Sequence, residues 1–225
     1  SSDKVKKVQK DFEATHVRPQ RLMKTLFTDE AYVKANVDEA RLMRRLFDLA
    51  CNMQSHDTDM QLYSLFTDEE CYDLWSCNNL YWYLTHACSP VTDGLMPYRE
   101  ADLLRNILDR ADAALKEGKN QATLRFGHES CLLPLVALLE LNHYGESYPD
   151  VEKLSEQWRA YDIFPMASNV QFVFFHKKGS NDVLVKVLLN EKEAKLPVKT
   201  DVAPYYHWKD VESYYREKLD KYQHI

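Results

Sequence analysis

Glycine is scarce in this sequence, and long apolar runs are missing. Only five of the 225 residues are glycine. Together with long stretches of helical periodicity, this favours helices over an all-β fold. The longest apolar run, residues 131–139, falls well short of the ~20 residues that a membrane-spanning helix needs. We therefore expect no membrane span.

Metal-ligand spacing is also missing. No Cys-x-x-Cys pair occurs, and the histidines at 16, 56 and 86 lie far apart in the sequence. We expect no metal and no cofactor. The cysteines are expected to be buried free thiols, with one disulfide in the helical part as the alternative in an oxidising compartment. The five cysteines are Cys51, Cys71, Cys77, Cys88 and Cys131.

An excess of positive charge is absent as well. The formal net charge is −6, which argues against nucleic acid and against an anionic membrane surface as partners. The charge is unevenly spread, because residues 1–45 hold eleven Lys and Arg against seven Asp and Glu. This positive portion suits a polyphosphate ligand, although a solvated helix face explains the same pattern.

Helical periodicity dominates the first half of the chain. Apolar residues recur at helical spacing over residues 18–27, 37–53, 67–85 and 99–116. Thr67 and Glu70 form a capping box at the start of the third helix, and Gly118 ends the fourth. Residues 15–118 are therefore predicted to form a helical domain.

Strand signals occur only in the second half, which we assign to a domain of residues 119–225. Residues 170–175 and 183–190 are apolar runs joined by a polar turn, a pattern typical of an antiparallel hairpin. Both runs are apolar at successive positions, which predicts a sheet covered on both faces. A short buried strand at 123–126 brings the number to three, and a helix is predicted over 208–222. The predicted fold class is α+β, mostly helical.

The third strand leads into the most informative stretch. Gly127 ends the strand, Ser130 is the predicted helix cap, and a helix is expected over residues 132–141. His128 and Glu129 then lie at a helix N-terminus, which attracts anions. Here His128 suits a phosphoryl oxygen and Glu129 suits proton donation to a leaving alkoxide. The alternative is that His128 is a buried structural histidine and Glu129 an ordinary first-turn acid.

The sequence of this stretch resembles that of the histidine acid phosphatases, and most closely that of the multiple inositol polyphosphate phosphatases and phytases. The matching letters are Leu-Arg-Phe-Gly-His at 124–128, an acid, and Leu-Leu-Pro-Leu at 132–135. Further matches lie at 18–27, at 75–78 with the aromatic residues 81–83, and at 166–172 with 183–197. The likeness covers nearly the whole chain, but only the later, C-terminal part of such an enzyme.

Two departures from the family pattern affect what the resemblance implies. The Arg-His-Gly motif that carries the family's nucleophilic histidine occurs nowhere in the 225 residues. The usual His-Ala-Glu is here His128-Glu129-Ser130, so the acid follows the histidine directly. We therefore expect a fragment that is inactive alone, with the nucleophile supplied by a missing N-terminal part of the same enzyme.

The resemblance implies phosphomonoester hydrolysis of inositol polyphosphates such as phytate. In this interpretation His128 binds phosphate and Glu129 is the proton donor. Residues 15–118 form a lid-like helical domain, and residues 119–225 belong to an incomplete α/β phosphatase core. The family also implies a secreted, periplasmic or lumenal location. Two alternatives stay open: a catalytically dead phosphate-binding module, and a helical interaction domain with no phosphate role.

Overall fold

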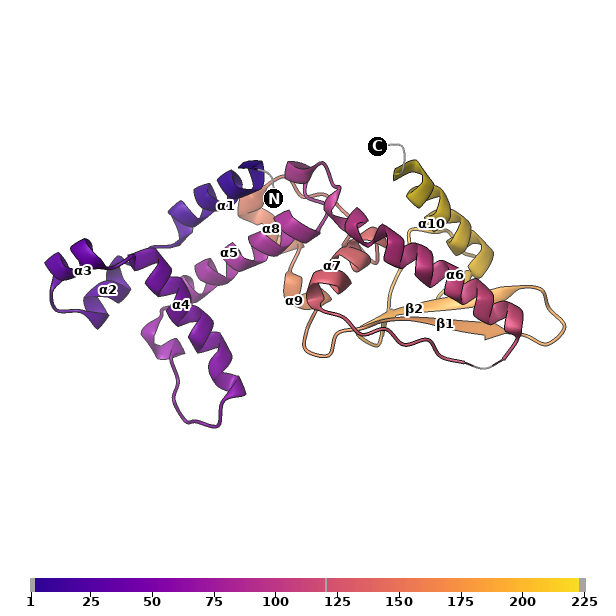
Figure 1. Cartoon of the computed structure of the whole chain (residues 1–225), viewed down its shortest axis with the longest axis horizontal. Helices are drawn as coiled ribbons and strands as arrows, with labels where there is room; N and C mark the ends of the chain where they lie inside the picture. The colour runs from indigo at the N-terminus through magenta and orange to yellow at the C-terminus, as the bar shows by residue number, and fades with distance from the viewer. Residues whose placement is uncertain (1–2, 120, 223–225) are drawn as a thin grey trace. The chain divides into compact units, whose positions relative to one another are not determined.

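The computed structural model describes residues 3–119 and 121–222 (Figure 1). The chain divides into two compact units, Ser1–Tyr81 and Trp82–Ile225. The division lies inside helix α5 (Asp68–His86). The division into domains 15–118 and 119–225 stays a prediction.

The first unit is helical throughout its regular structure, as its periodicity predicts. Its core holds Phe12, Leu22 and Met43, each 5% exposed or less. The predicted helices at 18–27 and 37–53 are confirmed as α2 and α4. The elements that precede α5 are α1 (Asp3–His16), α2 (Gln20–Leu26), α3 (Glu30–Asn36), α4 (Glu39–Asn52), η1 (Met53–Ser55) and η2 (Tyr63–Leu65).

The start of α5 has the capping box that the sequence predicts. The Glu70 amide donates to Thr67 Oγ1 at 3.2 Å, and the Thr67 amide donates to Glu70 Oε2 at 2.9 Å. Arg21 from α2 donates its Nε to Glu70 Oε1 at 2.7 Å. This hydrogen bond, more than any other cause, lowers the pKa of Glu70. The cap acid therefore also ties α2 to α5.

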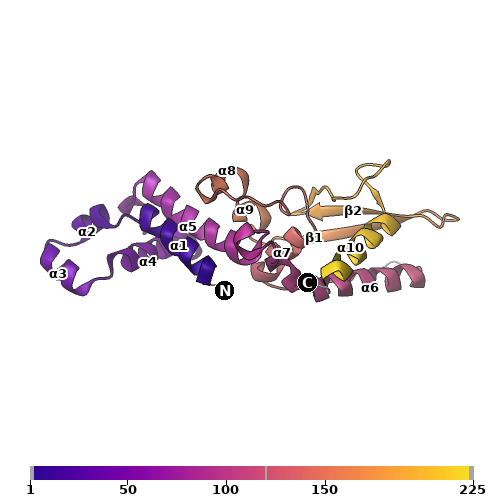
Figure 2. The same cartoon turned by 90° about the horizontal axis from the view of Figure 1, so that it is seen from above.

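The second unit combines helices with a small sheet. Gly118 ends α6 in the left-handed conformation, with φ of +63°, as predicted. Figure 2 shows α10 lying over the strands, beside α6. Among the described residues, no helix is both long and apolar enough to cross a membrane. The unit's helices are η3 (Pro90–Thr92), η4 (Met96–Glu100), α6 (Ala101–Glu117), α7 (Glu129–Leu138), η5 (Val151–Lys153), α8 (Leu154–Gln157), α9 (Ala160–Ile163) and α10 (Trp208–Tyr222).

The predicted hairpin is confirmed. Strands β1 (Val170–His176) and β2 (Val183–Leu189) pair antiparallel, with Phe172 opposite Val187. Two short strands that the sequence analysis missed, β3 (Lys192–Glu193) and β4 (Tyr206–His207), also pair with β2.

The expectation of a sheet covered on both faces is wrong. In β2 only alternate residues are buried, and no residue of β1 is fully buried. The covered face packs on α10, where the rings of Phe174 and Trp208 meet edge to face at 4.9 Å. The β2 residues of the other face remain partly accessible.

The predicted strand at 123–126 is not formed. Residues 121–128 have no regular secondary structure and all of them are exposed. Leu124 is 75% exposed and Phe126 is 94% exposed. The four strands found in the described part of the chain all lie after residue 169, and none of them pairs with this segment. A strand needs a neighbour to satisfy its backbone groups, and without one the segment stays extended but unpaired.

The five cysteines are free thiols, as predicted, but they are not all buried. Cys77 is buried, whereas Cys131 in the first turn of α7 is exposed. The alternative of one disulfide in the helical part is therefore wrong. Burial raises the pKa of the Cys77 thiol to about 12.

Candidate functional site

The N-terminus of α7 presents both candidate residues to solvent. His128 is the N-cap residue, with an extended backbone (φ −100°, ψ 166°), and Glu129 is the first helical residue. Both side chains are exposed. The His128 carbonyl accepts hydrogen bonds from the amides of Cys131 (3.0 Å) and Leu132 (3.1 Å). The backbone of His128 thus starts the helix, while its imidazole makes no capping hydrogen bond.

This arrangement corrects two sequence-based interpretations. Ser130 is not the cap, because the helix begins at Glu129, before Ser130. His128 is not a buried structural histidine, because its side chain is accessible. The first helical amides, those of Glu129 and Ser130, have no acceptor inside the helix. Together with the helix dipole they give this end of α7 a partial positive charge, beside an accessible imidazole.

The rest of α7 anchors the site. All residues from Leu133 to Leu138 are buried, so the helix is fixed at its C-terminal half and free at its N-terminal turn. In the segment that precedes His128, Arg125 donates a hydrogen bond from Nη2 to Asn106 Oδ1 of α6 at 2.8 Å. The segment that leads to His128 is therefore tethered by a polar contact, although its apolar side chains are uncovered.

A second histidine lies in the electrostatic environment of Glu129. His86, the last residue of α5, is only 7% exposed, and its ring meets that of Trp82 at 4.8 Å. Burial lowers the pKa of His86, and the positive charge of Arg99 lowers it further, while the charge of Glu129 opposes both. Sequence reasoning did not connect His86 or Arg99 to the site. No local pattern joins them to Glu129, because the packing of η4 against α7 creates this neighbourhood.

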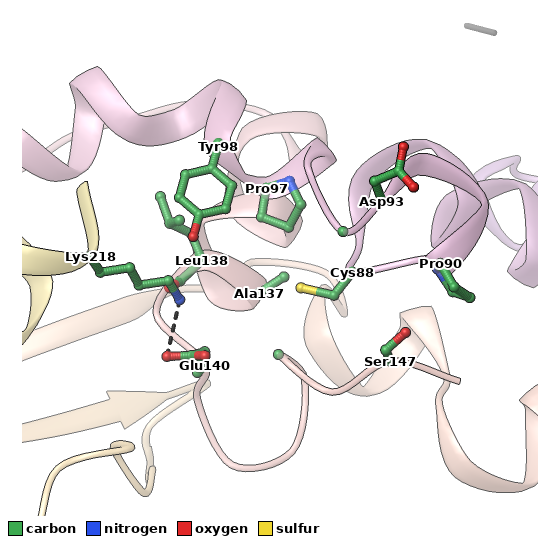
Figure 3. Close-up of a pocket in the computed structure, with 12 residues that line it drawn as sticks. Cys88, Pro90, Asp93, Pro97, Tyr98, Ala137, Leu138, Glu140, Ser147 and Lys218 are labelled. Atoms are coloured by element: carbon green, nitrogen blue, oxygen red, sulfur yellow. Dashed lines mark hydrogen bonds and ion pairs between the residues drawn. The ribbon is translucent and has the colours of Figure 1, made fainter. Parts of the chain in front are cut away.

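The candidate residues do not line the cavity that lies against α7. A cavity of about 540 Å³ lies at the other end of this helix, beside Ala137 and Leu138 (Figure 3). Ten helical residues separate the two ends, a distance of about 15 Å. The His128–Glu129 pair is therefore exposed and separate from this cavity.

Comparison with known proteins supplies the family. The sequence profile of the histidine phosphatase superfamily (branch 2) matches residues 1–190. Human multiple inositol polyphosphate phosphatase 1 is 28% identical over 134 residues, an alignment that covers 54% of this chain and 27% of the human protein.

Solved structures agree on the fold. The multiple inositol polyphosphate phosphatase of Bifidobacterium longum in complex with phosphate superposes with a TM-score of 0.68 at 21% identity, covering 80% of this chain and 40% of that one. Its complex with inositol hexasulfate gives a TM-score of 0.63 at 22% identity, with 78% and 38% covered. The chain thus spans well under half the length of these relatives. On the profile match, the chain belongs to branch 2 of the histidine phosphatase superfamily.

Proposed function

We propose that this chain is the acid-donating and phosphate-binding portion of a phosphatase that acts on inositol polyphosphates such as phytate. The observation that carries the proposal is the family match across residues 1–190, which includes the exposed His128–Glu129 pair at the N-terminus of α7. The named relatives support the substrate class. One is an inositol polyphosphate phosphatase, and another was solved with inositol hexasulfate, whose sulfate groups stand in for phosphates.

His128 would hold the transferring phosphoryl group. Its exposed imidazole and the free amides of the first α7 turn are donors directed toward an anion. Such donors stabilise the negative charge that grows on the phosphoryl oxygens in the transition state. A phosphate placed against this turn needs no displacement of an existing capping side chain, because none is present.

Glu129 would donate a proton to the leaving inositol oxygen and then activate water for the second step. It needs to be protonated when the substrate binds. A bound phosphate dianion favours this, because a nearby like charge disfavours the ionised carboxylate. Glu129 is exposed and is the residue next to the phosphate-binding histidine, so its reach to the ester oxygen depends only on its own three rotatable bonds.

The nucleophile would come from outside these 225 residues. The two-step chemistry of the family needs a histidine that attacks phosphorus and carries it as a phosphoenzyme. The sequence contains no Arg-His-Gly motif that would supply one. The chain alone is therefore proposed to bind phosphorylated inositols without turning them over.

The exposed segment before His128 supports the proposal that another part of the enzyme supplies the nucleophile. Leu124 and Phe126 are exposed, and they belong to a run with strand-forming composition. Isolated extended backbone with large exposed apolar side chains is suited to pairing with another strand. The nucleophile-bearing part would cover this segment and place its histidine beside His128.

Two polypeptides of different length test the proposal. Phytate hydrolysis is measured with this chain and with a longer polypeptide that includes an Arg-His-Gly segment. We expect turnover only from the longer polypeptide, and binding of inositol hexakisphosphate by the short chain in calorimetry. Binding without turnover by both would favour the catalytically dead module, and neither binding nor turnover by either would favour the helical interaction domain.

Glu129→Gln in the longer polypeptide tests the acid role. We expect a loss of about 10²–10⁴-fold on inositol phosphates, whose alkoxide leaving groups need a proton, and a much smaller loss on aryl phosphates with good leaving groups. The matched control is Glu146→Gln, since Glu146 is an exposed acid beyond the end of α7. Equal losses on both substrate types would remove Glu129 from the proton-donor role.

A further inference from the structure

The cavity at the C-terminal end of α7 is built from four separate segments of the second unit. It is lined by the loop before and within η4, by the last turn of α7, by the turn that follows, and by Lys218 of α10. Figure 3 shows the hydroxyl of Tyr98 directed toward the ion pair of Lys218 and Glu140. The cavity volume, about 540 Å³, is in the range of small-molecule sites.

Glu140 is held in place at a cost in backbone strain. Its φ is +53°, in the left-handed region that non-glycine residues rarely adopt. A Cβ on Gly145 would lie only 2.5 Å from the Glu140 side chain, so this neighbour must be glycine. Tyr214 donates a hydrogen bond to Glu140 Oε2, and Lys218 pairs with the same oxygen at 3.0 Å. Strain of this kind is a recurrent mark of ligand sites.

The ion pair of Lys218 and Glu140 does not use all of its hydrogen-bonding groups. Lys218 donates to the Leu138 carbonyl at 2.7 Å and pairs with Glu140. One of the three N–H donors of Lys218 is therefore available to a ligand. Within residues 3–119 and 121–222, neither Glu140 Oε1 nor the Tyr98 hydroxyl has a hydrogen-bond partner. Burial raises the pKa of Tyr98, so its hydroxyl stays protonated and can donate. One acceptor and two donors therefore converge on the same space.

We propose that this cavity binds a neutral polyhydroxylated molecule, a sugar or a cyclitol, through Tyr98, Glu140 and Lys218. A charged ligand would have to compete with the existing ion pair, whereas a neutral diol donates to Glu140 Oε1 and accepts from Tyr98 and Lys218 without separating it. The C–H face of such a ring would rest on Pro97, Ala137 and Leu138. This inference is independent of the phosphatase proposal, since the cavity and the His128 site lie at opposite ends of α7.

Tyr98→Phe is the sharpest test. The ring of Tyr98 stacks on that of Tyr222 at 4.2 Å, and phenylalanine keeps this contact while removing only the hydroxyl. With myo-inositol and glucose as probes, we expect saturable NMR shift changes at residues 137–147 and an affinity about three- to tenfold lower in the variant. Tyr32→Phe, at an exposed tyrosine that does not line the cavity, should leave the affinity unchanged.

Three outcomes would overturn the proposal. One is the absence of saturable shift changes at residues 137–147 with either probe. Another is equal affinity in wild type and Tyr98→Phe. The third is equal binding of cyclohexanol, which has the ring but a single hydroxyl and would indicate a merely apolar hollow. Shift changes confined to residues 127–131 would likewise place the sugar or cyclitol at the α7 N-terminus instead, without bearing on phosphate binding there.

Discussion

A half-buried carboxylate, that of Asp112, helps to join α6 to α10, and its replacement has an effect on stability whose size can be predicted. Asp112 of α6 accepts from the indole Nε1 of Trp208 at 2.9 Å and from Nη2 of Arg216 at 2.8 Å. The same guanidinium also reaches Asp109 at 2.9 Å. The Asp112 side chain is 24% exposed and that of Asp109 is 64% exposed. The two acids share one partner and differ in burial.

Asp112→Asn should therefore cost more stability than Asp109→Asn. A charge-assisted hydrogen bond contributes about 1.5–3 kcal/mol when it is desolvated, and partial exposure of this pair reduces the expected loss to about 1–2 kcal/mol. An exposed pair contributes about 0.2–1 kcal/mol, so we expect about 0.5 kcal/mol for Asp109→Asn. At about 2–4 °C per kcal/mol for a chain of this size, the two variants should differ by a few degrees in Tm.

The effect should also depend on pH in one direction. Burial acts to raise the pKa of Asp112, but the hydrogen bonds from Trp208 and Arg216, together with the positive charge of Arg216, hold the pKa below the usual value. A lowered folded-state pKa means that the stabilisation is fully present above the unfolded value of about 3.9 and is lost as pH falls through the folded value. The disadvantage of Asp112→Asn should therefore begin to shrink as pH falls below about 3.9 and disappear only below the folded-state pKa.

Urea unfolding followed by circular dichroism, at pH 7 and at steps down to pH 3.5, measures both effects. Arg216→Met serves as a third variant, because it should produce at least the loss of Asp112→Asn. Equal destabilisation by Asp109→Asn and Asp112→Asn at pH 7 would refute the argument from burial, and a gap that widens toward acid pH would refute the argument from the pKa.

Two further predictions concern the second unit. His207 lies between Asp182 and Asp201, each 3.0 Å from a different ring nitrogen, and their hydrogen bonds raise the pKa of His207 above 6.5. The contribution of these ion pairs to folding stability should be full below pH 6.5 and lost as pH rises through the folded-state pKa. NMR titration should show a lower pKa for His207 in Asp182→Asn. Gly145→Ala should reduce the free energy of unfolding by about 1–3 kcal/mol, because the new Cβ would lie 2.5 Å from the Glu140 side chain. Gly127→Ala, whose new Cβ meets its nearest neighbour at 4.0 Å, should change it by no more than about 0.5 kcal/mol in thermal melts.

Local signals predicted the elements whose structure depends on nearby residues. The capping box at Thr67, the helix stop at Gly118 and the hairpin around residues 178–182 are each decided within a few positions, and all three are confirmed. The final helix, Trp208–Tyr222, matches its predicted bounds. The prediction of a sheet covered on both faces failed because coverage depends on elements distant in sequence, which periodicity does not report.

The candidate site was predicted in part. The sequence placed His128 and Glu129 at a helix N-terminus, which is confirmed, although the helix starts at Glu129 rather than after Ser130. A capping serine is only a statistical preference, and here the extended backbone of His128 starts the helix without it. The neighbourhood of His86 and Arg99 was not predictable, because a buried histidine more than forty positions upstream shares no spacing with Glu129.

The segment at 123–126 has a composition that favours a strand but does not form one. Its residues favour a strand, yet a strand is a property of a pair, because extended backbone is stabilised only when a neighbour satisfies its amides and carbonyls. In the described chain that neighbour is absent, and Phe126 is left 94% exposed. The same absence uncovers the α7 N-terminus and leaves His128 without a facing wall. Under the proposed function, the part that supplies the nucleophile would pair with this segment, so strand pairing and turnover are proposed to arise together.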